Sequence, residues 1–182
     1  MKAYVVTEGQ LGRSLLELLV PQDLGDIVFV TATGSSGALS MARSLLATRP
    51  SPVALVLDSD SISPDFVRDR SRALYEIMSS ITSGAESAVF LAVPEMEGIF
   101  FQPPHLLERV LGLAIPETLQ ILAEARPKEA LNRLFAQHQS IKTVPQLLAA
   151  LAPSDYEELR TTKPIADLNE FLRHALHEAS AA

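Results

Sequence analysis

The stretch Val53-Ala-Leu-Val-Leu-Asp58-Ser-Asp60 indicates the fold class. Five apolar residues run together before the acids, without the polar and apolar alternation of a half-exposed strand. Strands that are apolar on both faces are typical of parallel sheets, which helices cover on both sides. Similar runs occupy residues 3–6, 27–31 and 88–93, so we expect a parallel sheet of about four strands.

Helical patterns separate these four runs. Leucines recur at helical spacing between residues 11 and 19 and between 39 and 46. A third apolar pattern extends from Phe66 to Met78, with Pro64 where a first helical turn favours proline. The order β-α-β-α-β-α-β predicts an α/β fold with a Rossmann-like, doubly wound parallel sheet.

The composition changes after Phe101. Strand-like runs disappear, Leu, Ala and Glu dominate, and prolines divide the remainder into short helical segments. No Gly/Ser-rich linker separates the two halves. We therefore expect an α/β domain over residues 1–101 and an all-helical extension over residues 102–182 that packs on it.

Composition and charge exclude several classes of protein. The 182 residues carry 15 Lys and Arg against 22 Asp and Glu, a net charge of −7, and no cysteine. Disulfides, thiolate metal sites and thiol catalysis are excluded, and autonomous nucleic-acid binding lacks its usual basic surface. Because no apolar run reaches the ~18 residues of a membrane span and no signal peptide is recognisable, we expect a cytoplasmic protein with no membrane association.

Acidic residues follow three of the four predicted strands. Glu8 follows the first strand, Asp58 and Asp60 the third, and Glu95 and Glu97 the fourth. The carboxyl ends of parallel strands form the usual ligand site of such sheets, and clustered carboxylates require protons or a cation. Oxygen ligands suit Mg²⁺, Mn²⁺ or Ca²⁺. The pattern predicts a divalent-metal site from Glu8, Asp58, Asp60 and one or both of Glu95 and Glu97.

Several of these residues resemble the motifs of the Toprim domain family. They are the strand end Val5-Val-Thr-Glu8-Gly9, the loop glycine Gly34 and the Asp58-Ser-Asp60 turn. The segment Val93-Pro-Glu-Met-Glu-Gly-Ile-Phe-Phe101 resembles a stretch of the overcoming-lysogenization-defect-type nucleases. It is also similar to small stand-alone Toprim-like proteins of phage-defence systems. The resemblance covers about residues 1–101.

The resemblance implies a divalent-metal-dependent nuclease or phosphodiester-processing subunit that acts on nucleic acid with a partner such as an ATPase. It implies that Asp58 and Asp60 hold Mg²⁺ or Mn²⁺ and that Glu8 is a metal-linked or general acid/base carboxylate. Glu97 or Glu95 would complete the site.

Further residues have supporting roles in this hypothesis. Gly9 would permit the tight turn from strand to helix, and Gly34 a close approach of the backbone to a ligand. Arg13, Arg68 and Arg72 are candidate phosphate contacts. The alternative for these arginines is surface ion pairing with neighbouring acids.

Two other functions stay open. The acidic charge and the Leu- and Ala-rich helical part favour a non-catalytic Toprim-like subunit that binds or regulates a partner in a defence or repair complex. That partner would be an ATPase or a second copy. Alternatively, the chain would be a receiver domain with Asp58 as its phosphoacceptor. Lys163-Pro164 resembles the end of such domains. If the protein is a nuclease, its shortage of basic surface implies that something else delivers the nucleic acid.

Overall fold

The computed structural model describes residues 2–81 and 84–181. Its first half alternates strands and helices, which confirms the predicted α/β class. The elements are β1 (Lys2–Glu8), α1 (Gly9–Leu19), η1 (Gln22–Leu24), β2 (Asp26–Ala32), α2 (Gly34–Thr48), β3 (Val53–Asp58), α3 (Pro64–Ser79) and β4 (Ser87–Ala92).

The four strands form one parallel sheet in the order β2-β1-β3-β4. The central strands β1 and β3 are buried on both faces, with Val5, Val6 and Leu55 fully inaccessible. That burial explains their continuous apolar sequence. The pairing of Thr7 with Val56 brings the carboxyl ends of β1 and β3 side by side, at the predicted location of the site.

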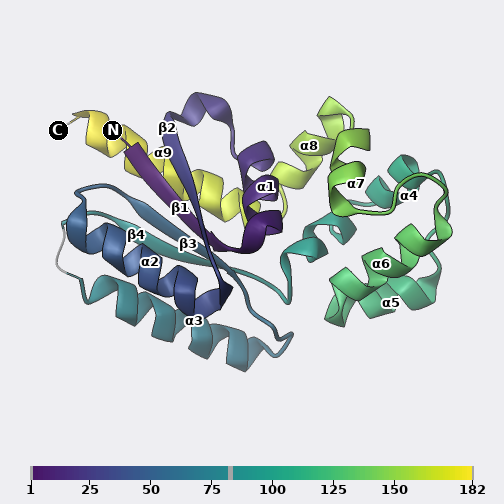
Figure 1. Ribbon diagram of the computed structural model, residues 1–182, viewed down its shortest axis with the longest axis horizontal. Coiled ribbons are helices and arrows are strands. Elements are labelled where there is room, and N and C mark those ends of the chain that lie inside the picture. The colour runs from purple at the N-terminus through teal and green to yellow at the C-terminus, as the bar shows by residue number, and fades with distance from the viewer. Residues whose placement is uncertain (1, 82–83, 182) are drawn as a thin grey trace.

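Helices cover both faces of the sheet (Figure 1). One face packs against α2 and α3 around Ala42, Leu46 and Met78. The other packs against α1 and the last helix, α9 (Ile165–Ala181), which buries Leu168 and Leu172 in the larger core cluster. The final helix therefore completes the covering of the sheet rather than extending away from it.

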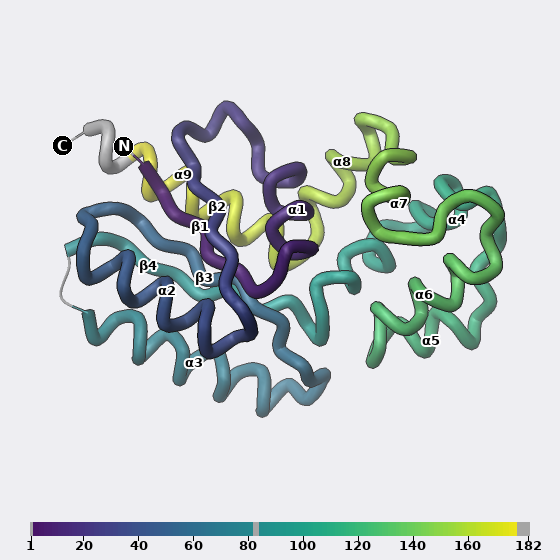
Figure 2. Tube along the Cα trace, viewed as in Figure 1, coloured from purple at the N-terminus to yellow at the C-terminus, as the bar shows by residue number. Residues whose placement is uncertain are grey.

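The part of the chain that connects β4 to α9 forms a lobe of short helices beside the sheet (Figure 2). A 3₁₀ segment, η2 (Met96–Phe101), leads into this lobe, and the second half is helical as predicted. The lobe contains α4 (Leu106–Leu111), α5 (Glu117–Ala125), α6 (Pro127–Gln137), α7 (Val144–Ala150) and α8 (Pro153–Arg160). Prolines lie in the first turns of α6, α7 and α8, where a missing N–H costs nothing. No helix in the described part of the chain is long and apolar enough to cross a bilayer.

Candidate functional site

At the ends of β1 and β3, the Glu8 carboxylate contacts the backbone of Asp58. The backbone N–H of Asp58 donates to Oε1 of Glu8 over 3.2 Å. The N–H of Met96, which begins η2, donates to Oδ1 of Asp58 over 2.8 Å. The first bond holds the Glu8 carboxylate at the end of β3, and the second holds the Asp58 carboxylate against the segment that follows β4.

A cavity of about 160 Å³ opens at this point. Glu8, Asp58 and Glu97 line it, so three of the five predicted metal ligands share one cavity. Lys128, from the first turn of α6, lines the same cavity. Two acids from the sheet, one from η2 and a lysine from the helical lobe therefore meet in one place.

The pKa of the Asp58 carboxyl is raised to about 7, mainly because the group is buried. The hydrogen bond from the Met96 N–H lowers this pKa, and the negative charges of Glu97, Glu8 and Asp60 raise it. Burial also raises the pKa of Glu97, whose side chain is nearly inaccessible, and the charge of Lys128 opposes that rise. Keeping these carboxylates ionised therefore costs free energy, which a proton or a bound cation would offset.

The remaining two predicted ligands point elsewhere. Oδ2 of Asp60 lies 3.2 Å from Nη1 of Arg70, which also donates to the carbonyl of Ser59. Oε2 of Glu95 accepts from the backbone N–H of Lys128 at 3.2 Å. Across residues 2–81 and 84–181, no group of three or more His, Cys, Asp or Glu side chains is arranged to hold a metal ion.

The predicted phosphate-contacting arginines lie outside the cavity. Each pairs with an acid on its own helix: Arg13 with Glu17 at 2.6 Å, Arg68 with Asp65 at 3.0 Å and Arg72 with Glu76 at 2.9 Å. Nor does Lys163, of the receiver hypothesis, line the cavity; it lies 3.5 Å from Asp167.

Three glycines shape the strand-to-helix turns. Gly9 (φ 71°) and Gly34 (φ 67°) open α1 and α2 in the left-handed region, where a side chain is strained. Gly9 thus lets α1 begin directly after Glu8. A Cβ at Gly12 would lie 2.8 Å from Oγ1 of Thr7, so α1 can approach β1 this closely only with glycine there.

Sequence reasoning did not identify Lys128, Arg70 or the spatial role of Gly12. Lys128 is distant in sequence from the strand ends, and only the path of the helical lobe brings it back to them. For Arg70, the sequence signal is its position about one and a half helical turns beyond Pro64-Asp65, in the helix that follows the Asp58-Ser-Asp60 turn. None of the three belongs to a recognisable motif.

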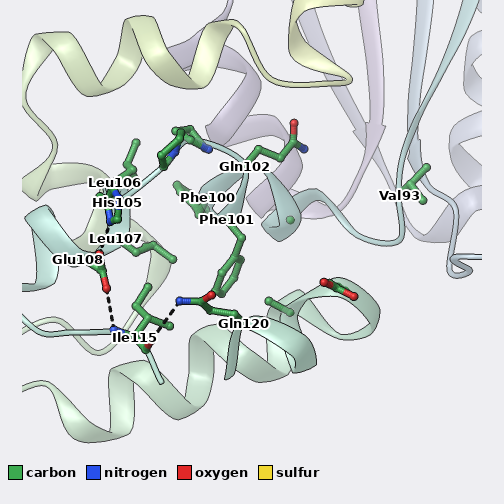
Figure 3. A pocket seen from close by; sticks show the side chains of 15 residues that line it. Val93, Phe100, Phe101, Gln102, His105, Leu106, Leu107, Glu108, Ile115 and Gln120 are labelled. Carbon is green, nitrogen blue, oxygen red and sulfur yellow. Dashed lines mark hydrogen bonds and ion pairs between the residues drawn. The ribbon is translucent and has the colours of Figure 1, made fainter. Parts of the chain in front are cut away.

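A larger cavity, about 480 Å³, lies between η2, α4 and α5 (Figure 3). Phe100, Phe101 and neighbouring apolar side chains line much of it. Three of its polar side chains bond to the protein: His105 Nδ1 to Glu108 at 2.5 Å, Glu108 to the Ile115 N–H at 3.1 Å and Gln120 to the Ile115 carbonyl at 3.2 Å (Figure 3). We therefore regard the smaller carboxylate cavity as the candidate site, because burial raises the pKa values of two of its carboxyl groups, Asp58 and Glu97.

Comparisons with protein-family models, with curated proteins and with solved structures give no match for this chain. The candidate site is accordingly defined by its own geometry.

Proposed function

We propose that the protein is a divalent-metal-dependent phosphodiesterase of the Toprim nuclease type, acting on nucleic acid. The supporting observation is the partly buried Asp58, whose backbone contacts the Glu8 carboxylate and which lines the same cavity as Glu97. Three acids line this cavity and two of them have raised pKa values, so a cation that drew these side chains together would offset the cost of ionising them.

The donor set fits Mg²⁺ or Mn²⁺ in chemistry, since it consists of carboxylate oxygens. The hydrogen bonds described above use Oδ1 of Asp58 and Oε1 of Glu8, which leaves Oδ2 of Asp58 for a cation and Oε2 of Glu8 for a proton. Asp60 could join after breaking its pair with Arg70. That pair is weak, because the Asp60 side chain is 68% exposed.

Each residue then has a distinct role. A bound divalent ion would lower the pKa of a water molecule and stabilise charge on a phosphate. Asp58 and Glu97 would hold the ion, and Glu8 Oε2 would accept the proton of the attacking water. The Lys128 ammonium, at the rim of the cavity, would contact a phosphate oxygen of the substrate.

The test is cleavage of single- and double-stranded DNA and RNA by the purified full chain with Mg²⁺ or Mn²⁺. We expect cleavage that requires the metal and that Asp58→Asn abolishes. Glu124→Gln, an exposed acid outside the carboxylate cavity, should leave cleavage unchanged. If neither cation binds and no nucleic acid is cut, with or without a candidate ATPase partner, the proposal is wrong.

A second candidate is a non-catalytic, metal-binding subunit that regulates a protein partner. The observation that favours it is the ion pairing of Arg13, Arg68 and Arg72, which leaves Lys128 as the basic side chain lining the cavity among the described residues. Cation binding at Asp58 without cleavage of any nucleic acid would favour this candidate over the nuclease.

A further inference from the structure

The β4 strand forms an open edge of the sheet. In the part of the chain that the structure describes, it pairs with β3 on one side and with no strand on the other. The carbonyl of Glu86 accepts from the N–H of Val53 in β3 at 3.0 Å, and the carbonyl of Ala92 accepts from the N–H of Ser59, just after β3, at 2.8 Å. Because hydrogen-bonding direction alternates along a strand, Ser87, Val89 and Leu91 direct their backbone N–H and C=O groups outward.

A groove of about 280 Å³ runs along this edge. Val67 and Ser71 of α3 form one wall, and Lys163 and Asp167, at the start of α9, form the other. Residues 89–91 and Val93 line the groove between them. An open strand edge between two helices is the geometry into which an added strand fits.

Exposed apolar side chains gather on the adjoining helix. Of the eight large hydrophobic residues exposed in the described chain, five lie on α3, just before it or just after β4. They are Ile62, Phe66, Tyr75, Ile77 and Val93. Tyr75 follows Ser71 by one helical turn and therefore lies on the groove side of α3, and Val93 lines the groove itself, whereas Phe66 lies half a helical rotation away from Tyr75.

The charge of this surface favours a second copy of the chain as the occupant. The chain carries −7, so two copies repel each other across most of their surfaces. Helix α3 is neutral, with three arginines and three acids: Arg68, Arg70, Arg72, Asp65, Asp69 and Glu76. Opposite charges flank β4: Glu86, just before the strand, is exposed and lies 3.8 Å from His174, and Lys163, which lines the groove, is exposed and lies 3.5 Å from Asp167.

We infer that two copies of this chain associate by antiparallel pairing of their β4 edges. A two-fold axis perpendicular to the sheet makes the pairing antiparallel, so the outward N–H and C=O groups of Val89 and Leu91 bond to the same strand of the partner. The axis also places α3 against the partner's α3, covering Tyr75 and Val93, and brings Glu86 towards the partner's Lys163. The carboxylate cavities then face opposite ends of the joint sheet, so this interface does not depend on the proposed function.

Light scattering coupled to size-exclusion chromatography of the full chain tests this inference. We expect a species of twice the 19.7 kDa chain mass within about 1–200 µM, the range of a moderately stable dimer. Ser71→Arg places a long cation in the groove, and Val89→Pro removes an outward N–H without breaking a bond to β3. Each should weaken dimerisation at least about tenfold, since edge pairing supplies the contact.

The matched control is Ser40→Arg on the exposed surface of α2, which should dimerise as the wild type does. Circular dichroism establishes that each variant is folded. In the wild type, the amides of Val89 and Leu91 should exchange with solvent more slowly as concentration rises. A wild type that stays at 19.7 kDa throughout overturns the inference, as does a dimer that survives both groove variants.

Discussion

Replacing Asp58 with asparagine should stabilise the protein, although the residue lies at the centre of the proposed site. Asparagine keeps an Oδ1 that can accept from the Met96 N–H and removes the charge. Raising a pKa from 3.8 to about 7 corresponds to about 4 kcal/mol, at about 1.4 kcal/mol for each tenfold change in proton affinity. Because the carboxyl keeps some solvent contact, we expect about 2–4 kcal/mol at pH 8.

The sign follows from linkage. The pKa of Asp58 is higher in the folded state, so its contribution to stability is complete below about pH 4 and is lost as the pH rises through about 7. The advantage of Asp58→Asn should therefore be full at pH 8 and close to zero at pH 4. Groups that do not interact with Asp58 titrate alike in both proteins and cancel in the difference.

Urea denaturation of both proteins in the presence of a chelator measures this difference directly. Asp60→Asn is the matched control, because its carboxylate is exposed and pairs with Arg70, so removing its charge should change stability by less than about 1 kcal/mol. If Asp58→Asn is less stable than the wild type at pH 8, or if its advantage does not vary with pH, the account of this carboxylate is refuted.

Two further substitutions test the surroundings of the site. Lys128→Gln removes the positive charge that lowers the pKa of Glu97. Under the proposed function it should slow metal-dependent cleavage about tenfold or more, the usual scale for losing one charge contact in a site. An unchanged rate would exclude a contact between Lys128 and the phosphate. Gly12→Ala forces a methyl group to 2.8 Å from Oγ1 of Thr7 and should destabilise the protein by about 1–3 kcal/mol in thermal or urea unfolding. Gly37→Ala, whose new methyl would meet its nearest neighbour at an ordinary 3.6 Å, should be neutral or stabilising, and equal losses in the two variants would contradict the packing argument.

The sheet could be predicted because each of its features has a local signal. The continuous apolar runs at 3–6 and 53–57 reflect burial on both faces, and parallel strands bring their carboxyl ends together wherever the helices lie. The contact of Glu8 with Asp58, 50 residues apart, follows from that topology. The role of α9 did not follow, because the spacing of Leu168 and Leu172 indicates an apolar face but not the surface that it covers.

Two features of the site could not be predicted from the sequence: the directions of its side chains, and the contact between the helical lobe and the ends of the strands. Asp60 has a positive φ of 54°, and its carboxylate turns towards Arg70 instead of the cavity. Glu95 bonds to the backbone at the start of α6, a helix that the sequence did not place near the sheet. Lys128 enters the cavity for the same reason. These positions depend on tertiary packing, which a spacing rule along the chain does not contain.

Calorimetric titration of the metal-free protein with Mn²⁺ at pH 8 tests the central claim most directly. We predict saturable binding that Asp58→Asn abolishes, accompanied by a Mn²⁺-dependent rise in the unfolding temperature of the wild type alone. Saturable binding that Asp58→Asn leaves intact, or no binding by the wild type at millimolar Mn²⁺, would contradict the proposal that this carboxylate cavity is a metal site.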